Sequence, residues 1–286
     1  MAEPRDPSGA GPRRAARAVL ADRYAAVVAN APPGTNGLGV AVRADDGWTW
    51  DHESEHVMVS ASTIKVLVLC AVLSLVDQGR VGLDDRVALP PVEERVGGDG
   101  SLHLLPSVDA LPLLELLRLM IAVSDNAATN AVIDHAGLLN GSSADLAAVL
   151  ATVPTRHTQL RRRLMDLDAA SRGLQNETCA ADLADLLGAL RQGRLLAPKS
   201  TRVAIEILRS QQVRNGLPAY LPPDVLVAAK PGDLPGLRAE VALLERGDRW
   251  AVVAVAADGL ISDGVDRGTA LLPVFAALGE LTATLL

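Results

Sequence analysis

Aromatic side chains are scarce in this sequence, which has three tryptophans, two tyrosines and one phenylalanine among 286 residues. The core must therefore be filled by leucine, valine and alanine, which help to bring the hydrophobic fraction to 49%. That fraction, with 21% charged residues, is typical of globular proteins. The length suits one large domain, or two interleaved subdomains, with a sizeable core.

Concentrated positive charge is also missing, since the formal net charge is −7 at pH 7. The one basic run, "LRRRL" at 160–164, lies in a mostly acidic chain and predicts local salt bridges. We therefore expect no nucleic-acid partner. No apolar run approaches the roughly 18 residues of a membrane span, so we also expect no membrane partner. Nothing indicates assembly, and we expect a monomer.

An export signal is not apparent at the N-terminus, although Arg13 and Arg14 form an arginine pair. An export signal needs an apolar region of 7 to 15 residues, and the segment that follows is interrupted by charges at Arg17, Asp22 and Arg23. It predicts an amphipathic helix instead. We therefore expect a cytoplasmic protein.

Metal-ligand spacing is absent as well. The two cysteines, Cys70 and Cys179, have no histidine or cysteine at ligand spacing, and the five histidines form no spaced cluster. In the cytoplasm both thiols are expected to be reduced. We expect no metal and no cofactor.

Predicted strands lie at both ends of the chain. Residues 38–55 are typical of a hairpin around an Asp-Gly turn, and three apolar segments separated by turn signals lie in 225–258. Helical periodicity dominates between these groups. We predict an α+β fold in which a five-stranded antiparallel sheet from both chain ends is covered by terminal helices near 11–29 and 265–284. The predicted organisation is a flexible tail (1–10), a sheet subdomain (11–61 and 216–286) and a mostly helical inserted subdomain (62–215).

The stretch "SASTIK" at 60–65 carries the first chemical signal, because Ser62 precedes Lys65 by one helical turn at the start of an apolar run. Residues at i and i+3 share a helix face. A serine there is favoured by the positive end of the helix dipole, and a neighbouring lysine amine can take its proton. An isolated S-x-x-K pattern is more often a cap and a surface lysine, so other signals must decide.

Two further motifs follow in order. "VSDNAATN" contains Ser124, Asp125 and Asn126 after a helical segment, and "AAKPGDLPG" places Lys230 and Gly232 at the end of a predicted strand. Each motif is weak alone, but their order and structural context strengthen one another.

With these three motifs, the sequence resembles the class A β-lactamases and the wider group of penicillin-recognising serine enzymes, from about residue 18 to 286. The resemblance implies that Ser62 is the acyl-accepting nucleophile and Lys65 its proton acceptor. It implies that Ser124 relays a proton to the leaving group and that Lys230 supplies positive potential beside it.

Substrate binding is assigned from the same resemblance. It implies that Asn126 binds the substrate amide, that the strand at Gly232 borders the substrate, and that the backbone N–H groups of Ser62 and Asp233 form an oxyanion hole. We expect Asp125 to have a structural role, holding its loop through backbone hydrogen bonds. His103, in the glycine-rich "GGDGSLHLL", is expected at the mouth of the cleft.

The strand motif departs from the family pattern. Pro231 stands where the family has threonine or serine, so a hydroxyl that helps to bind a β-lactam carboxylate is missing. Asp233 follows, and its carboxylate should repel an anionic substrate and attract a cationic or hydroxylated one.

The Ω-loop departs further. Aligned without gaps through "TQLRRRLMDLDAASRGLQNETCAADL", Leu164 takes the position of the family's general-base glutamate. The same alignment predicts a salt bridge between Arg162 and Glu177 across the loop neck. Asp166 and Asp168 are near enough to be considered as substitute bases, although solvated helix-turn charges, with an Arg162–Asp166 pair, explain them more simply.

We therefore predict a β-lactamase-like serine hydrolase or acyltransferase that cleaves a small-molecule amide, ester or lactam through acyl-Ser62, with poor penicillinase activity. The alternatives are a genuine class A β-lactamase with a substitute base, an intracellular transacylase, and a non-catalytic binding protein. A peptidoglycan carboxypeptidase is a further alternative, which the expected cytoplasmic location disfavours.

Overall fold

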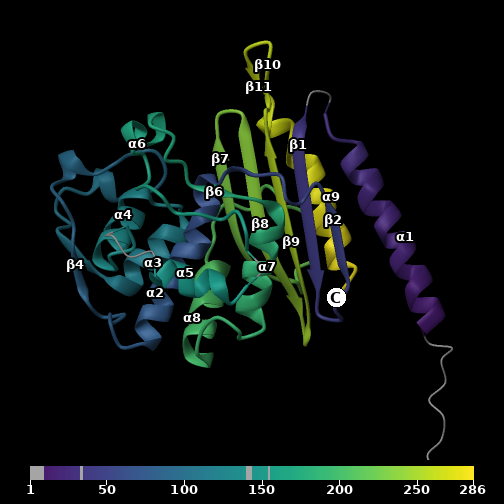
Figure 1. Cartoon of the computed structure of the whole chain (residues 1–286), viewed down its shortest axis with the longest axis horizontal. Coiled ribbons are helices and arrows are strands. Elements are labelled where there is room, and N and C mark those ends of the chain that lie inside the picture. Colours follow the sequence, from purple (N-terminus) through teal and green to yellow (C-terminus); the bar gives the residue numbers. More distant parts are fainter. Residues whose placement is uncertain (1–9, 33–34, 140–143, 154) are drawn as a thin grey trace, which may run out of the picture.

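The computed structural model describes residues 10–32, 35–139, 144–153 and 155–286 (Figure 1). All but the last residue of the predicted N-terminal tail lies outside the described residues. No helix in the described part of the chain has the length and apolarity to span a membrane.

A five-stranded antiparallel sheet forms the middle layer of the molecule, as predicted. Its strand order is β2-β1-β9-β8-β7, so strands from the two ends of the chain pair at its centre. The hairpin predicted near the N-terminus is confirmed, with Val42 opposite Trp50. The strands are β1 (Asn36–Ala44), β2 (Thr49–His52), β7 (Leu226–Leu234), β8 (Leu237–Arg246) and β9 (Arg249–Asp258).

Two terminal helices cover one face of the sheet, α1 (Ala10–Ala29) and α9 (Leu272–Ala283) (Figure 1). They share a buried cluster with the sheet residues of that face, and the Tyr24 hydroxyl lies 2.8 Å from the Thr282 hydroxyl. Burial raises the pKa of the Tyr24 phenol. The final helix begins later than predicted, because a small hairpin of β10 (Ile261–Ser262) and β11 (Val265–Asp266) and a 3₁₀ turn (Gly268–Leu271) precede it. Positive φ angles at Asp263 and Gly264 suit a tight hairpin turn, a signal that outweighs the helical pattern.

The helical part packs on the other face. Its helices are α2 (Ile64–Asp77), α3 (Leu113–Ala122), α4 (Asn126–His135), α5 (Ala144–Ala151), α6 (Leu167–Ser171), α7 (Ala180–Arg191) and α8 (Pro198–Arg209). Its short strands are β3 (Met58–Val59), β4 (Arg86–Ala88), β5 (Ala110–Pro112) and β6 (Glu177–Thr178), and 3₁₀ turns span Ala61–Thr63, Val92–Glu94 and Leu102–Leu104. The helices α7 and α8 contact the sheet directly.

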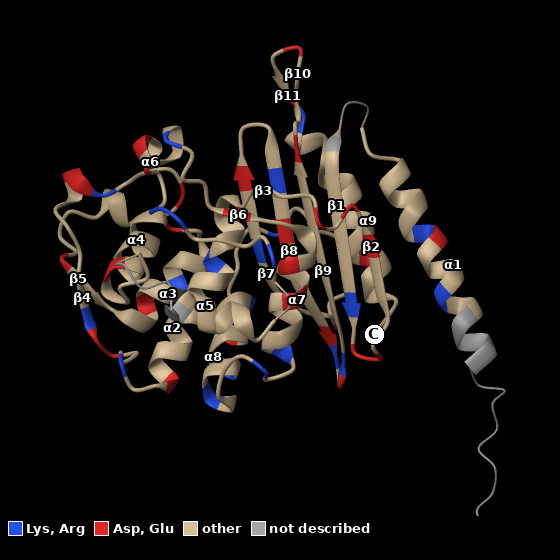
Figure 2. Cartoon of the chain, viewed as in Figure 1, with Lys and Arg blue, Asp and Glu red and all other residues tan. Residues whose placement is uncertain are grey.

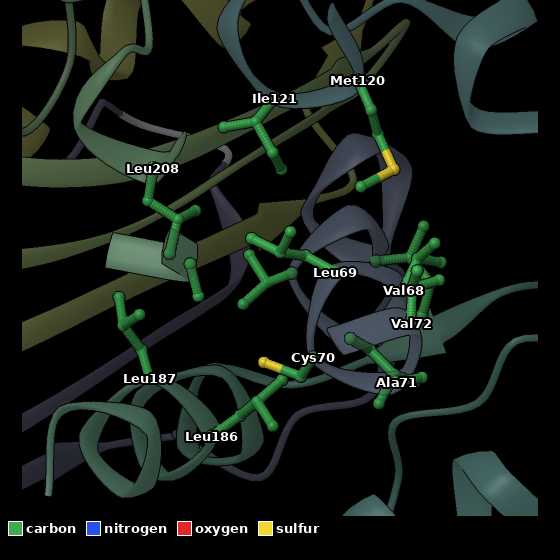
Figure 3. Packing of buried hydrophobic residues seen from close by; sticks show 14 of the residues in the cluster. Val68, Leu69, Cys70, Ala71, Val72, Met120, Ile121, Leu186, Leu187 and Leu208 are labelled. Atoms are coloured by element: carbon green, nitrogen blue, oxygen red, sulfur yellow. The ribbon is translucent and has the colours of Figure 1, made fainter. Parts of the chain in front are cut away.

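The helix α2 is the centre of this larger core. Eleven of its 14 residues are buried, so it is apolar on all sides, as a central helix must be. Figure 3 shows Leu69 and Cys70 of α2 facing side chains of neighbouring helices, among them Leu186 and Leu208. Burial raises the pKa of the Cys70 thiol to about 12, so this cysteine has the environment of a packing residue.

Charged residues of both signs are interspersed over the described elements (Figure 2). The edge strand β7 runs beside the start of α2, and the two meet at Gly232. A Cβ atom at Gly232 would lie 3.0 Å from the backbone nitrogens of Ser62 and Thr63. Glycine therefore permits the close approach that puts strand β7 against the predicted nucleophile.

Candidate active site

Ser62 and Lys65 come together at the entry to α2. Ser62 lies in the 3₁₀ turn Ala61–Thr63 that leads into the helix, and Lys65 Nζ is 3.0 Å from Ser62 Oγ. Lys65 is fully buried and Ser62 is 8% exposed. Ala61, directly before the serine, has φ +44°. This backbone conformation is unfavourable for alanine, so the surrounding structure must hold it in place. The serine is thus held in place, with the lysine as its immediate neighbour.

The loop before α4 completes the environment of this lysine. Lys65 Nζ lies 2.7 Å from the carbonyl oxygen of Ser124, 3.0 Å from Ser124 Oγ and 2.9 Å from Asn126 Oδ1. Ser124 has φ +56°, and this turn aims both its oxygens at the amine. Four oxygens therefore surround the buried nitrogen of Lys65. Of these four, Ser62 Oγ is the atom that the family resemblance predicts to be the nucleophile.

Lys230 approaches the same serine pair from β7. Its Nζ is 3.2 Å from Ser124 Oγ and 2.7 Å from the carbonyl oxygen of Pro231, and Ser124 Oγ is 2.9 Å from Ser62 Oγ. The hydroxyls of Ser62 and Ser124 and the amines of Lys65 and Lys230 thus form one connected hydrogen-bonding cluster. A proton leaving Ser62 has a short path through it.

Burial decides the protonation of both amines. It lowers the pKa of Lys65 from 10.5 to about 7, against the opposing negative charges of Asp99 and Asp125. The pKa of Lys230 is also well below its ordinary value, first because of burial and then because of the positive charge of Lys65. A lysine with a pKa near 7 is partly uncharged at pH 7 and can accept the Ser62 proton, whereas a lysine with the ordinary pKa is almost fully protonated there.

Asp125 has the contacts of a structural residue. Its side chain accepts hydrogen bonds from the backbone N–H groups of Ser101, Leu102 and Ala128 at 2.6 to 2.9 Å. The carboxylate is fully buried and caps α4 while it holds the 97–102 loop over the cleft. Gly100 lies directly on it, since a Cβ there would come within 2.3 Å of Asp125 Cα. Asp125 therefore positions the loop and its neighbours Ser124 and Asn126.

Two cavities open from Ser62, and we name them by the elements that bound them. The strand-side cavity, about 190 Å³, is lined by Ser62, Ser124, Lys230 and residues of β7 and β8. The loop-side cavity, about 290 Å³, is lined by Ser62, Asn126 and residues of β3, the loop before α6, the start of α6 and the end of β7. Asp99 and Asp233 line both. The site is therefore a cleft with Ser62 at its middle.

The predicted salt bridge between Arg162 and Glu177 is wrong. Glu177 pairs instead with Arg161, with 2.8 Å between Arg161 Nη1 and Glu177 Oε2. Arg162 turns inward, donates to Gln175 Oε1 at 3.3 Å and lines the loop-side cavity. The chain pairing Gln159–Glu177 and the hydrogen bonds from the N–H groups of residues 161 and 162 to Asn176 set this direction. In a run of three arginines, backbone direction decides which one reaches the acid.

Leu164 nevertheless lies on the cleft wall, as its alignment suggests. Its backbone N–H donates to Asn130 Oδ1 at 2.8 Å, and its carbonyl oxygen accepts from Asn130 Nδ2 at 3.0 Å. The side chain lines the loop-side cavity. This two-sided contact with α4 fixes the loop where the family's general base is expected, but the side chain there is apolar.

The two candidate substitute bases lie elsewhere. Asp166 caps α6, accepting from the Ala169 N–H at 2.9 Å, and lines a separate cavity of about 430 Å³ behind Leu164. Asp168 is exposed in the first turn of α6. Neither lines a cavity that contains Ser62. The predicted Arg162–Asp166 interaction is limited to a long-range electrostatic effect. Burial lowers the pKa of Arg162, and the negative charge of Asp166 acts in the opposite direction.

Asp233 is at the cleft, but its charge is compensated. Arg238 Nη2 lies 2.8 Å from Asp233 Oδ2, an ion pair that joins β7 to β8. Burial raises the pKa of Asp233, while Arg238 acts in the opposite direction. His103 lines neither cavity that contains Ser62, and its ring lies beside Gly97. We expected His103 at the mouth of the cleft, but it borders neither of these two cavities.

Several cleft residues were not found from the sequence, and three of them carry acidic or amide side chains that border Ser62's cavities. Asp99 lines both cavities, and Asn176 lines the loop-side cavity. Glu240 of β8 lines the strand-side cavity, 3% exposed, and accepts from the Leu217 N–H at 2.7 Å, while its other oxygen, Oε1, has no hydrogen-bond partner. Burial raises the pKa of Glu240 to about 7. No local motif marks any of the three.

The described residues contain no cluster of three or more histidine, cysteine or acidic side chains suited to a metal ion. The arrangement that they do contain is a serine hydroxyl beside a buried lysine amine, a second serine within hydrogen-bonding distance of both, and a second lysine beside it. Such a group is suited to acyl transfer through a covalent serine ester.

The comparisons with known proteins agree with this geometry. The sequence matches the family described as "Beta-lactamase enzyme family" over residues 19–270. The chain belongs to the beta-lactamase enzyme family. A β-lactamase from Rhodobacter capsulatus is 29% identical over 180 residues, which cover 60% of this chain and 57% of that relative.

Several solved structures share the fold. The β-lactamase of Sphaerobacter thermophilus DSM 20745 superposes with a TM-score of 0.78 at 27% identity, covering 93% of this chain and 97% of the other. The structure of PBP-A gives 0.78 at 26% identity, covering 93% and 96%. A leucine-to-glutamate mutant of PBP-A, determined as an acyl-enzyme complex with penicillin G, gives 0.77 at 25% identity, covering 93% and 97%.

Proposed function

We propose that this protein is a serine hydrolase or acyltransferase that cleaves a small-molecule amide, ester or lactam through an acyl-Ser62 intermediate, and that it hydrolyses penicillins poorly. The observation that carries the first part is the 3.0 Å contact between Ser62 Oγ and Lys65 Nζ, together with the burial that lowers the pKa of Lys65 to about 7. Lys65 takes the Ser62 proton, Ser62 Oγ attacks the acyl carbon, and Ser124 returns a proton to the leaving group.

Slow hydrolysis follows from the loop. Leu164 occupies the cleft wall without a proton acceptor, and Asp166 and Asp168 lie outside both cavities. General-base catalysis typically contributes about 10²–10⁴-fold. With no base at the position of Leu164, we expect water attack on the acyl-enzyme to be slow and the ester to accumulate. The penicillin G acyl-enzyme of a PBP-A mutant supports the capacity of this fold to hold such an intermediate.

Acyl transfer to an acceptor other than water is the second candidate, and the same apolar wall favours it. An acyl-Ser62 ester that resists water persists long enough for an amine or alcohol to attack it. The rival reading as a non-catalytic binding protein does not account for the shared proton path of Ser62, Lys65, Ser124 and Lys230.

The test is covalent labelling. The protein is incubated with a fluorophosphonate or with penicillin G, and the intact mass is followed over time. We expect one adduct, located on Ser62, absent from Ser62→Ala and retained by Ser74→Ala, a serine of the same helix outside the site. Labelling of Ser62→Ala at the rate of the parent would contradict the proposed nucleophile.

The second measurement is steady-state hydrolysis of a chromogenic cephalosporin, with product analysis in the presence and absence of an added amine. We expect a burst followed by slow turnover. A kcat/KM in the usual enzyme range of about 10⁴–10⁸ M⁻¹s⁻¹ would show that another group in the cleft acts as the base that activates water.

A further inference from the structure

The two cavities that meet at Ser62 differ in chemical character. The strand-side cavity contains Ser124, Lys230, Arg238 and Glu240, all polar or charged. The loop-side cavity is lined by five larger aliphatic side chains, and polar residues border it as well, namely Ser60, Asp99, Asn126, Arg162, Asn176 and Asp233. We name these aliphatic side chains the apolar wall: Val59, Leu164, Met165, Leu167 and Leu234. One side of the nucleophile thus suits a polar group and the other an apolar one.

Val59 and Leu164 pack partly against the core, whereas the other three residues of the wall are exposed to solvent. Met165 is 43% exposed, Leu167 68% and Leu234 38%. They come from the loop before α6, from α6 itself and from the end of β7, so three separate elements present apolar side chains to one cavity. Exposed apolar surface gathered around a concavity marks a ligand or partner site. The covalent attachment point inside the cavity indicates a ligand.

The two parts of the substrate, the leaving group and the acyl group, can each be assigned to one of the two cavities. Ser124 and Lys230, which handle the leaving-group proton, line the strand-side cavity and are absent from the loop-side one. The leaving group therefore departs on the strand side. The acyl group that stays on Ser62 must extend into the other cavity, along the apolar wall.

The wall is held in place before any ligand arrives. Asn130 fixes both backbone polar groups of Leu164, and Asp166 caps the short helix that carries Leu167. Met165, between them, has φ +62° and its side chain lines the cavity. A preformed wall of this kind binds an aliphatic chain without a large ordering cost.

We propose that the acyl group carried by Ser62 is an aliphatic chain longer than acetyl, bound along Val59, Leu164, Met165, Leu167 and Leu234. This inference rests on the proposed acyl-Ser62 function and names its substrate class. Ser62 Oγ forms a bond to the carbonyl carbon of an alkanoyl ester or amide as the bond to the leaving group breaks. The Ser62 proton passes through Lys65 and Ser124 to the leaving group, and water or another acceptor later takes the acyl group.

The experiment compares p-nitrophenyl acetate, butyrate, hexanoate and octanoate as acyl donors. Burial of a methylene accelerates acylation by about two- to fourfold, according to how fully the wall covers it. From acetate to hexanoate, four methylenes therefore raise kcat/KM by about 16- to 250-fold. Intact-mass analysis confirms that each acyl group is on Ser62.

Matched variants locate the effect. Leu167→Asp and Leu234→Asp are expected to reduce the ratio of hexanoate to acetate kcat/KM by about tenfold or more, because each places a charge beside the chain. Leu226→Asp is the control, since Leu226 is 52% exposed at the opposite end of the same strand as Leu234. It should leave the ratio unchanged.

The outcomes separate this inference from the function on which it rests. Labelling of Ser62 by all esters with no gain from chain length overturns the apolar-wall assignment and leaves the serine mechanism intact. Failure of every ester and of a fluorophosphonate to label Ser62 overturns both. Sedimentation gives a further check, because a dimer that Leu167→Asp dissociates and Leu226→Asp does not would make the wall a protein interface instead.

Discussion

Acylation of Ser62 should depend on pH through Lys65. At pH 7 a lysine with the ordinary pKa of 10.5 is neutral in about 1 of 3,000 molecules, whereas one with a pKa of about 7 is neutral in about half. Burial therefore raises the population of usable base about a thousandfold. The sign follows directly: below pH 7 the amine is protonated and inactive, and above it the neutral form accepts the Ser62 proton.

The assay is the rate of Ser62 labelling by a fluorophosphonate between pH 5 and 9, at constant ionic strength. We expect the rate to rise with a midpoint near pH 7 and then level off. Lys65→Met should lower the plateau by about 10²–10⁴-fold, the usual contribution of a general base, and abolish the midpoint. Labelling that is independent of pH, or that rises only near pH 10, would refute Lys65 as the base.

Asp99 provides a second, more selective perturbation. Its negative charge raises the pKa of Lys65, in opposition to burial, and its side chain is exposed at the cleft mouth. Asp99→Asn should therefore move the midpoint of the labelling profile to lower pH. High salt should move the parent midpoint in the same direction, because an exposed charge is screened. A shift to higher pH in the variant would contradict this electrostatic account.

Three further predictions follow from other residues. Leu164→Glu should shorten the lifetime of a penicillin adduct on Ser62, followed as intact mass over time, because it supplies a carboxylate base. Leu164→Gln has no carboxylate and should not shorten it. Equal lifetimes for the two variants would refute the assignment of Leu164 to the general-base position. Burial raises the pKa of Glu240 from 4.5 to about 7, so the native state holds this proton more tightly than the unfolded state. As the pH rises from 5 to 8 this advantage disappears, and the free energy of unfolding should fall by about 3 kcal/mol. Urea unfolding of Glu240→Gln should lack this fall, and an identical pH dependence in the variant would contradict the prediction. Asp182, 3% exposed, accepts four hydrogen bonds around Thr158, and Asp182→Ala should lower the free energy of unfolding by about 2–4 kcal/mol in the same assay, with an unchanged value counting against a stabilising role.

The sheet and the nucleophile environment were predictable because their signals are local. The Asp-Gly turn marks the β1–β2 hairpin, and apolar segments separated by turn residues mark β7 to β9. Ser62 and Lys65 are one helical turn apart, so their contact follows from helix geometry alone. Their meeting with Ser124 and Lys230 could be inferred only through the family resemblance, since no spacing rule brings together segments so distant in sequence.

Other features depend on packing that the sequence does not display. Glu240 occupies an apolar strand, and its burial arises where it meets Gly216, at which a Cβ would come within 2.1 Å of the carboxylate. The neck salt bridge was assigned to the wrong arginine because Arg161 and Arg162 are adjacent and chemically identical. Only the backbone direction set by Asn176 distinguishes them.

The pairing of β1 with β9 has a consequence for how the chain matures. Val40 pairs with Val255, so β1 emerges from the ribosome long before its central partner exists. Until β9 has been synthesised, this strand keeps an unpaired edge that is open to misassociation. Lys230 and Gly232 are likewise among the last parts of the site to be made. A truncated product is therefore expected to lack the second lysine of the site, and such late, long-range pairing is typical of slow folding.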